Sequence, residues 1–319
     1  MAVVTSTVSQ KSHTFQSTTK GLITFSAALL SIWHLPVFVV KQKWNGIAQH
    51  LAAVVLANTD IAILTLFSTL KNVSVYAIYS MISTGIFLVV SNLGSGIEPI
   101  LGSIIAKKEN KSLNHFFNLY EWLMHNATVL LFSATMVLIT DFVKVYTKSV
   151  TDVNYYVPVF AILLTIAYMT ICIHIPYNCV IQASGHFKET QISAIIEPII
   201  NLVVSVALVF HFGLVGVAIG TIVAITYRMF YLAIYLTKHI MQRPLVTFLK
   251  YLITDSLITY VIYYVNSNFT AMTEITYYAW AIRACKVFSL ALVISAIFNF
   301  VFYNKLLKQG MNYIFKREI

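Results

Sequence analysis

Apolar runs that approach the length of a membrane-crossing helix recur along almost the whole chain. A bilayer core about 30 Å thick needs about 20 consecutive, mostly apolar helical residues. Such runs lie at about residues 22–40, 48–70, 74–104, 116–140, 155–181, 190–210, 214–236, 249–265 and 280–302. The third and fifth are long enough to be tilted or broken near Pro99, Pro158 and Pro176. The sequence therefore predicts an all-α polytopic bundle of eight or nine transmembrane helices.

The composition excludes an ordinary soluble domain. Of 319 residues, 59% are hydrophobic and 10% are charged, and the mean hydropathy is +0.80, whereas soluble domains carry about 25% charged residues. The net charge of +10 does not indicate a nucleic-acid partner, because the basic residues lie in short gaps between the apolar runs. The three cysteines lie inside apolar runs without metal-ligand spacing, which is typical of small core residues.

The distribution of basic residues predicts the orientation in the membrane. If the "KQK" stretch at 41–43 is cytoplasmic, thirteen Lys and Arg residues lie on that side and three on the other. The C-terminus is then cytoplasmic. Residues 1–21 are rich in Ser and Thr, and the 22–40 run is a span, a signal anchor or the remnant of a lost helix.

A polar stripe runs through the apolar segment 190–210. Ser193, Glu197, Asn201 and Ser205 follow one another at steps of four, which keeps them on one helix face. Since lipid offers no hydrogen bonds, this face must contact protein or water. Ser and Asn are equally well explained as contacts between helices. Glu197 is a functional candidate, because an intramembrane carboxylate is costly without a role.

Asp60, in "LANTDIAIL", lies near the middle of a span. A lone Asp at that depth costs several kcal/mol unless it is paired or neutral. Arg283 and Lys286 are candidate partners, although both also lie near enough to the outer surface to reach it. Asp255 is a further intramembrane candidate, and Glu121, near a predicted helix start, is assigned a structural role.

Arg228 shares one helix face with Thr221, Tyr231 and Tyr235. Two interpretations have equal weight. Its side chain either extends to the cytoplasmic surface, or points inward as a cation between tyrosine rings, an arrangement suited to a phosphate or a sugar ring.

Two weaker candidates complete the set. Glu98 and Glu197 both lie in the sequence Ile-Glu-Pro-Ile. This four-residue match is too short to establish a repeat. His174 is either a cavity residue or a partner of the carbonyl freed by Pro176.

Signatures of soluble enzymes are absent from the sequence. It contains no Gly-rich phosphate loop, metal-ligand cluster or nucleophile elbow. The hydrophilic gaps are too short to hold a catalytic domain, so no catalytic residue, metal or cofactor is expected.

Several stretches carry a family resemblance. They are "NTDIAILTLFSTLKNVSVYAIYSMI" (58–82), "GSGIEPILGSIIAKKE" (94–109), "FFNLYEWL" (116–123), "VKVYTKSVTDVNYYVPVF" (143–160) and the 44 letters of 185–228 that begin "GHFKETQISAIIEPIINL". In this order and spacing the chain resembles the polysaccharide-biosynthesis oligosaccharide flippases, within the superfamily that includes MATE-type multidrug exporters. The resemblance covers about residues 48–305.

The resemblance implies a transporter in a bacterial inner membrane. Its substrate would be undecaprenyl-pyrophosphate-linked sugar units for capsule, exopolysaccharide or O-antigen assembly. Two lobes would move by alternating access, driven by a proton or sodium gradient. Asp60, Glu98, His174, Glu197 and Asn201 would line the cavity or couple ions, and Arg228 would contact the phosphate or sugar.

Relative to such flippases, the first lobe is absent. We expect a polar segment 1–21, a remnant span with a cytoplasmic connection at 22–47, a second lobe at 48–240, and an extra helix pair with a basic tail at 241–319. The expected partners are a lipid-linked oligosaccharide, membrane lipids and a separate first lobe or polysaccharide-assembly proteins, and no nucleic acid. Three alternatives remain: a cation-coupled exporter of small amphiphiles, a membrane-embedded transferase acting on lipid-linked sugars, and an inactive remnant.

Overall fold

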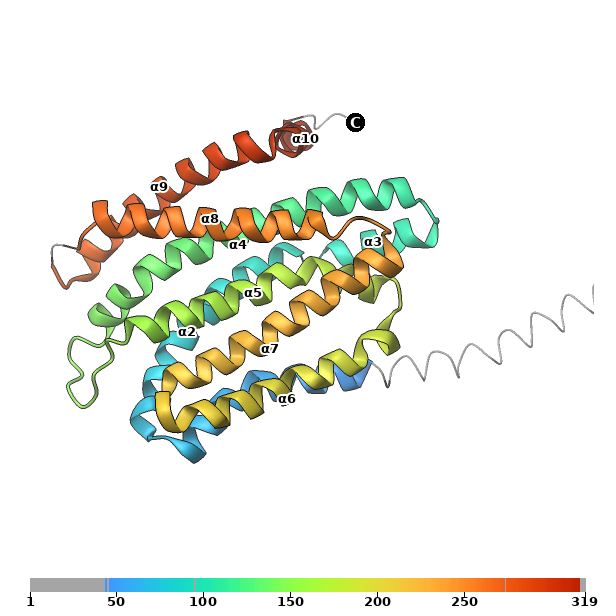
Figure 1. Cartoon of the computed structure of the whole chain (residues 1–319). Coiled ribbons are helices and arrows are strands. Elements are labelled where there is room, and N and C mark those ends of the chain that lie inside the picture. Colours follow the sequence, from blue (N-terminus) through green and yellow to red (C-terminus); the bar gives the residue numbers. More distant parts are fainter. Residues whose placement is uncertain (1–43, 45, 95, 273, 316–319) are drawn as a thin grey trace, which may run out of the picture. The chain divides into compact units, whose positions relative to one another are not determined.

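The computed structural model describes residues 44, 46–94, 96–272 and 274–315, and residues 49–319 form one compact unit. In the described part, eight helices are long and apolar enough to cross a membrane (Figure 1). They are Gly46–Phe67, Leu70–Ala106, Lys111–Tyr146, Pro158–Ala183, Phe187–Phe212, Leu214–Ile240, Val246–Phe269 and Tyr277–Phe302. The predicted all-α polytopic bundle is confirmed. The 22–40 run lies outside the described residues.

The labelled elements subdivide these spans. They are α2 (Leu70–Gly94), α3 (Ile97–Ala106), α4 (Asn110–Tyr146), α5 (Pro158–Ala183), α6 (Phe187–Phe212), α7 (Leu214–Tyr235), the π-helical η1 (Leu236–Ile240), α8 (Val246–Phe269), α9 (Tyr277–Phe302) and α10 (Asn304–Phe315). The helix Gly46–Phe67 precedes them.

Glycine and proline explain where the long apolar runs begin, break and continue. The third run divides into α2 and α3 at Gly94, where a Cβ atom would lie 2.6 Å from the Tyr120 hydroxyl. Pro99 lies in the first turn of α3 and Pro158 starts α5, positions where a missing N–H costs little. The fifth run is unbroken, since α5 continues through Pro176.

Two very short turns connect α5 to α6 and α6 to α7, and α7 packs against both of the other helices. Gly185 has φ +75°, and its N–H donates to the Gln182 carbonyl while the His186 N–H donates to Ile181. This pair of bonds is a Schellman motif, which favours glycine at the left-handed position. Gly213, with φ +53°, alone separates α6 from α7.

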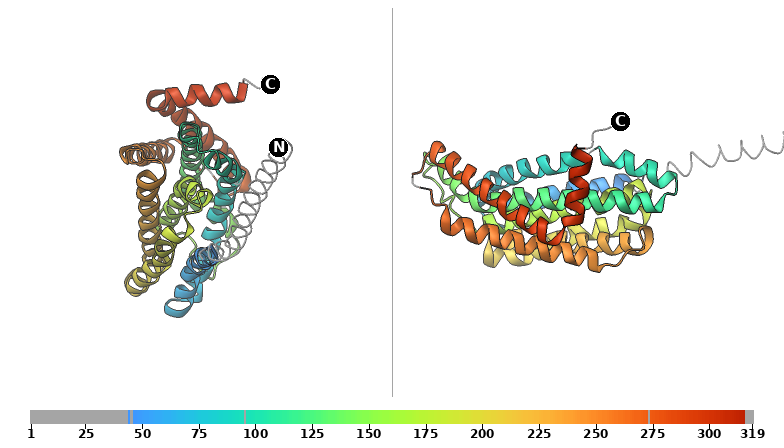
Figure 2. Two further views of the ribbon diagram at one scale, coloured as in Figure 1. Left: turned by 90° about the vertical axis from the view of Figure 1, so that its right-hand side faces the viewer. Right: turned by 90° about the horizontal axis from the view of Figure 1, so that it is seen from above.

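Helix α5 lies at the centre of the bundle, and Figure 2 shows the helices around it. It packs against α7, α4 and α2, while α6 packs along α7 and the α8–α9 pair packs against α4. Close approach of α6 and α7 depends on the glycines of the GxxxG sequence. A Cβ atom at Gly216 would lie 2.5 Å from the Leu208 carbonyl oxygen, and one at Gly220 would overlap the Ser205 hydroxyl. Both glycines therefore allow α6 and α7 to pack closely.

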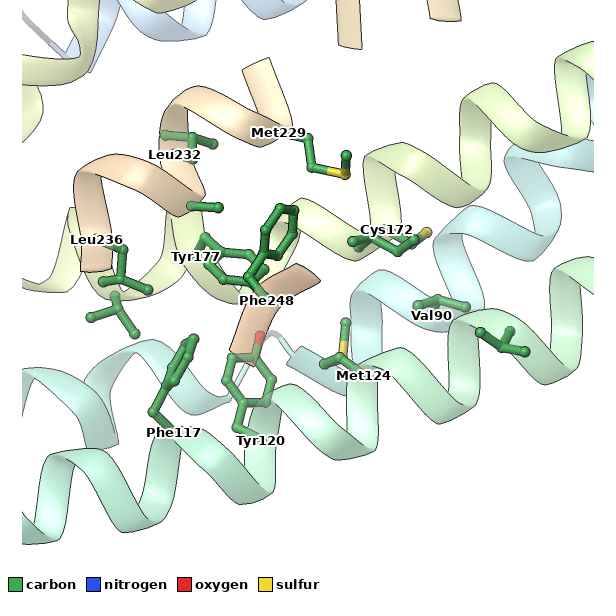
Figure 3. Packing of buried hydrophobic residues seen from close by; sticks show 14 of the residues in the cluster. Val90, Phe117, Tyr120, Met124, Cys172, Tyr177, Met229, Leu232, Leu236 and Phe248 are labelled. Carbon is green, nitrogen blue, oxygen red and sulfur yellow. The ribbon is translucent and has the colours of Figure 1, made fainter. Parts of the chain in front are cut away.

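Two large hydrophobic clusters fill the interior. One joins α2, α4, α5, α7 and α8 (Figure 3), and its members include Val90, Phe117, Tyr120, Met124, Cys172, Tyr177, Met229, Leu232, Leu236 and Phe248. The other joins the helix Gly46–Phe67 to α2, α4, α5 and α7, and includes Ile63, Tyr79, Ile139, Phe160 and Val217. Because α5 contributes to both clusters, it holds α2, α4 and α7 in place around it.

The connections gather at two ends of the bundle. Residues from the α3–α4 connection, the α5–α6 turn and the end of α7 surround one shared cavity. We call this end, which carries exposed Lys107, Lys108, Lys188 and Lys238, the basic end. Its assignment to the cytoplasm remains a prediction from the charge distribution.

Candidate functional site

A cleft of about 410 Å³ opens between the helix Gly46–Phe67 and helices α2, α5, α6 and α7. Its lining combines apolar and aromatic side chains with polar groups. The lining residues are Ala53, Leu56, Ala57, Asp60, Tyr76, Thr84, Phe87, Leu164, Ala167, Tyr168, Ile171, His174, Glu197, Thr221 and Ile225. Three of the six predicted site residues, Asp60, His174 and Glu197, therefore face one space.

Asp60 is held by three donors from three helices. The Tyr76 hydroxyl donates to Oδ2 over 3.0 Å, Thr221 donates to Oδ2 over 2.8 Å, and the Asn201 amide donates to Oδ1 over 3.0 Å. The residue is 3% exposed. The predicted partners were wrong, because Arg283 forms an ion pair with Asp141 instead. Within the described part of the chain, Asp60 thus has only neutral donors and forms no ion pair, so a negative charge on it has no compensating cation there.

A compact group of oxygen atoms continues from Asp60 between α6 and α7. The Ser205 hydroxyl donates to Asn201 Oδ1 over 2.8 Å and lies 3.3 Å from the Val217 carbonyl oxygen. The Thr221 hydroxyl lies 3.0 Å from the same carbonyl. One carboxylate, two hydroxyls, one amide oxygen and one main-chain carbonyl are therefore gathered here, the ligand types that hard cations prefer.

Glu197 and Arg228 form a second, adjacent pair. The Arg228 Nε atom lies 3.8 Å from Glu197 Oε2, while its Nη1 donates to the Thr190 carbonyl over 2.9 Å and to the Ser193 hydroxyl. Arg228 is 5% exposed, so the interpretation in which it extends to the surface is wrong. The separation from Glu197 is long for a charge-assisted hydrogen bond, so the pair is an ion pair without a direct bond.

The polar stripe of α6 faces protein, as the four-residue spacing predicted. Ser193, Glu197, Asn201 and Ser205 are all buried. The stripe contacts the Asp60 group at one end and Arg228 at the other. Asn201 thereby joins the predicted site through Asp60, and the two polar groups lie one helical turn apart on the same face.

The remaining two candidates differ. His174 faces the cleft, and its Nδ1 has no hydrogen-bond partner among the described residues, so no bond to a carbonyl freed by Pro176 is formed. Glu98 is exposed near the start of α3, is not among the residues that line the cleft, and has no ion pair in the described part of the chain. The structure therefore does not bring Glu98 into the group.

Sequence reasoning missed two aromatic residues of the cleft. Tyr76 bonds Asp60, and the Tyr168 hydroxyl bonds Thr84 over 2.9 Å. Both tyrosines lie in apolar runs without a polar pattern. A tyrosine buried in a membrane helix needs a hydroxyl partner, and this requirement was the available signal.

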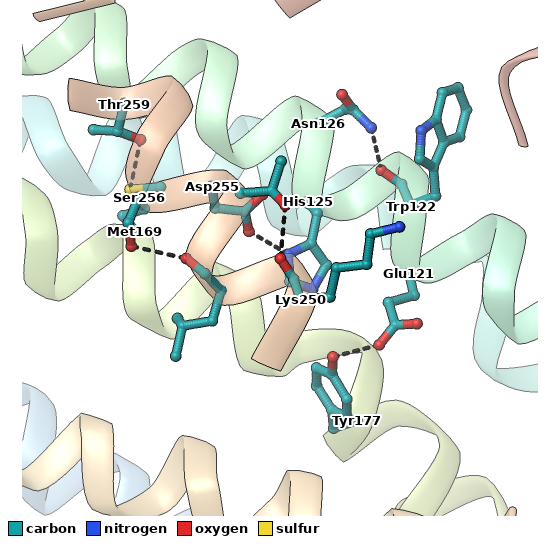
Figure 4. Close-up of polar contacts among 12 residues, drawn as sticks. Glu121, Trp122, His125, Asn126, Met169, Tyr177, Lys250, Asp255, Ser256 and Thr259 are labelled. Atoms are coloured by element: carbon teal, nitrogen blue, oxygen red, sulfur yellow. Dashed lines mark hydrogen bonds and ion pairs between the residues drawn. The ribbon is translucent and has the colours of Figure 1, made fainter. Parts of the chain in front are cut away.

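A second buried polar group lies outside the cleft and fastens α8 and the preceding connection to α4. Figure 4 shows its contacts between His125 and Asp255 and between Glu121 and Tyr177. Arg243 makes a two-bond contact with Glu121, at 2.8 and 2.5 Å, and the Tyr177 hydroxyl donates to the same carboxylate. His125 Nδ1 lies 2.5 Å from Asp255 Oδ2. The structural role assigned to Glu121 fits this position.

Arg243 lies in the connection before α8, outside the spans. Burial opposes its charge, but the hydrogen bonds and negative charge of Glu121 outweigh burial and raise the Arg243 pKa above its usual value. The guanidinium therefore stays charged at any physiological pH. In the described residues, no group of three or more His, Cys, Asp or Glu side chains is arranged to hold a metal ion.

Comparison with known proteins places the fold. No protein-family model and no curated protein matches the chain. Among solved structures, it is similar to the lipid II flippase MurJ in an inward-closed conformation, with a TM-score of 0.60 and 16% identity over 83% of this chain and 53% of MurJ. The chain shares the MurJ fold. The chain spans about half the length of MurJ.

A second structure supports the same fold. It is a MOP superfamily transporter from Pyrococcus furiosus, for which reverse polarity of the binding pocket suggests a different function. The TM-score is 0.52, with 13% identity over 82% of this chain and 64% of the transporter. The likeness to both structures confirms the predicted fold and carries no conclusion about the substrate. The polysaccharide subtype, the missing first lobe and the division at residue 240 remain predictions.

Proposed function

We propose that the chain is the ion-coupled half of a membrane transporter that flips lipid-linked sugar units by alternating access. The observation that carries the proposal is the cleft in which Asp60, His174, Glu197 and Thr221 face one space between five helices. The shared fold with a lipid II flippase supports it.

A cleft of this kind suits a sugar headgroup. Each hydroxyl of a sugar needs a polar partner at bilayer depth, because lipid provides none. Tyr76 and Tyr168 supply hydroxyl groups and flat rings, and Thr221 and His174 supply further polar atoms. A volume of about 410 Å³ lies within the usual range for ligand sites, about 300–1,000 Å³.

The Asp60 group is suited to ion coupling. One buried carboxylate beside four neutral oxygens balances one positive charge, so a sodium ion or a proton would satisfy it. A loaded carboxylate releases Tyr76, Thr221 and Asn201 from part of their attraction to Asp60. Because these donors come from α2, α7 and α6, the packing of three helices then depends on occupancy.

Arg228 supplies the positive charge for the lipid pyrophosphate. Its ion pair with Glu197 is long, while its bonds to Thr190 and Ser193 hold the guanidinium in place. In this proposal a phosphate oxygen replaces Glu197 as the anion nearest to Arg228, which is buried beside Glu197 and becomes accessible from the cleft when the helices move. Glu197, no longer paired with Arg228, then binds a proton or a metal cation. Substrate binding is thereby linked to ion binding.

The proposed setting follows the charge distribution and the fold. The basic end and C-terminus face the cytoplasm of a bacterial cell, and the chain lies in the inner membrane. The first lobe, supplied by another polypeptide, closes the cleft. Polysaccharide-assembly proteins are the alternative partners. The transported units serve capsule, exopolysaccharide or O-antigen synthesis, and no catalytic residue or nucleic acid takes part.

One observation favours a second candidate, a cation-coupled exporter of small amphiphiles. Most residues that line the cleft are apolar or aromatic, including Leu56, Phe87, Leu164 and Ile171. Such a lining binds small amphiphiles without a lipid-linked sugar. The transferase alternative gains nothing, since both similar solved structures are transporters.

Complementation of a flippase-deficient strain tests the proposal. The full chain is expressed alone and together with the first lobe of a two-lobe flippase, and surface polysaccharide is measured. We expect restoration when the lobe is present, and loss of restoration by Arg228→Gln. An exposed cation at the opposite end, Lys71→Gln, is the matched control. If both polypeptides reach the membrane and co-purify but no polysaccharide is exported, the proposal is refuted; export of a fluorescent amphiphile instead supports the second candidate.

A further inference from the structure

A second cavity, of about 350 Å³, lies at the basic end, away from the cleft. The α3–α4 connection, the α5–α6 turn and the π-helical segment η1 form its walls. Apolar side chains of α3, α4 and η1 form one part of the lining. Its polar residues are Lys108, Glu109, Ser184, His186 and His239.

Tyr235 holds both histidines of this cavity. Its hydroxyl lies 2.8 Å from His186 Nδ1, and its carbonyl oxygen lies 3.2 Å from His239 Nδ1. The rings of Tyr235 and His239 stack with centroids 4.6 Å apart. Since a carbonyl only accepts, His239 Nδ1 is the donor of its bond. The Nε2 atom of each histidine has no partner among the described residues.

Local backbone geometry shapes the same cavity. The Met241 N–H donates to the Leu236 carbonyl over 3.0 Å, which closes the wide π-helical turn. Such turns are rare and occur often at functional sites. Lys108 has φ +57°, a left-handed conformation that is uncommon for lysine. Two unusual backbone segments thus present His239 and Lys108 at one cavity.

The surroundings favour an anion at membrane-surface depth. Exposed Lys107, Lys188 and Lys238 lie beside the cavity, and the nearby acids are Glu109 and Glu189. The polar lining lies where helices end, and the apolar lining lies on the helices themselves. This order, polar at the helix ends and apolar along the helices, matches the boundary between lipid headgroups and acyl chains.

We propose that this cavity binds the phosphate group of a membrane lipid, with His186, His239 and Lys108 as donors. The His186 Nε2–H and the lysine ammonium contact phosphate oxygens, and His239, whose Nδ1 already donates to the Tyr235 carbonyl, contacts them through Nε2–H as the doubly protonated imidazolium. Where the headgroup carries a hydroxyl or ammonium group, as in a glycerophospholipid, Glu109 accepts a hydrogen bond from it. The apolar lining contacts the first carbons of the lipid chains.

Two lipids could supply this phosphate: a glycerophospholipid and an isoprenoid diphosphate. The proposal does not rest on the transport function, because a glycerophospholipid would bind here even in a chain that transports nothing.

Lipid binding to the purified full chain in phosphate-free dodecyl maltoside micelles tests the proposal. One arm adds phosphatidylglycerol, a second adds undecaprenyl diphosphate, and a third adds inorganic phosphate alone. The variants are His186→Ala, His239→Ala and Lys108→Ala, with Lys108→Arg to restore the charge. His211→Ala, an exposed histidine at the opposite end of α6, is the matched control.

We expect at least one lipid arm to bind, and each alanine variant to weaken that binding about tenfold, the change that loss of one charged hydrogen bond produces. Lys108→Arg and His211→Ala should bind like the parent chain. The arm that binds identifies the source of the phosphate. Equal binding by all variants, equal loss in the His211→Ala control, or binding of inorganic phosphate without either lipid would overturn the proposal. Elution profiles of each variant separate lost binding from lost folding.

Discussion

Replacing Asp60 by Asn removes the negative charge of the oxygen group and keeps the shape of the side chain. The Asn oxygen can still accept from Tyr76 and Thr221, while its NH₂ group then faces the Asn201 amide. One interhelical hydrogen bond is lost, worth about 0.6 kcal/mol on average in membrane proteins. A bound cation about 4 Å from the missing charge loses about 4 kcal/mol at an effective dielectric constant of about 20. This corresponds to about a thousandfold weaker cation binding.

Sodium titration of the purified full chain, with unfolding followed in parallel, separates the two effects. We expect saturable sodium or proton binding in the parent chain, its loss in Asp60→Asn, and only a small change in unfolding midpoint. Asp152→Asn, in the exposed loop before α5, is the matched carboxylate control. A parent chain that binds neither ion, or an Asp60→Asn variant that binds like the parent, would refute the reasoning.

Three further predictions concern stability. Gly220→Ala should lower the stability of the detergent-solubilised protein by about 1–3 kcal/mol through overpacking. The control Gly85→Ala, whose added Cβ atom meets no atom within 4 Å, should not lower it. Equal unfolding midpoints of the two variants would contradict the packing role of Gly220. Glu121→Gln should cost about 3–5 kcal/mol by leaving Arg243 buried without its anion, and the double change Glu121→Met with Arg243→Met should recover much of that loss. The pKa of Arg243 is raised in the folded chain, so its contribution persists below its unfolded pKa and is lost only as pH rises through the folded value. Because the ordinary arginine pKa already lies far above this range and the folded value is higher still, the cost of Arg243→Met should stay constant from about pH 7 to 10. A cost that falls within that window would contradict the assignment.

The sequence predicted the elements and the faces of individual helices well. Apolar run length located the spans, and the spacing of Ser193, Glu197, Asn201 and Ser205 identified a buried face. Each of these signals is local, because it depends on run length or on helix period.

The pairing of buried charges could not be predicted in this way. The partners expected for Asp60 were cations of α9, yet its actual contacts are neutral donors of α2, α6 and α7. Helix period shows which face of each helix is polar, but it does not show which helices are neighbours. Glu98 illustrates the same limit, since four shared letters with the Glu197 segment did not place it in the cleft.

The polar ties between α4 and the α8–α9 pair extend along α4 from Glu121 to Asp141. Glu121 and His125 bond the α8 side near one end, Asn126 bonds Asn299 of α9, and Asp141 pairs with Arg283 near the other end. Sliding or swinging these helices apart would expose several buried ions to acyl chains at once. They therefore act as a stationary block. Under the proposed function, we expect the motion that uncovers Asp60 to come from the opposite flank, where α6 and the helix Gly46–Phe67 have most of their surface turned outward.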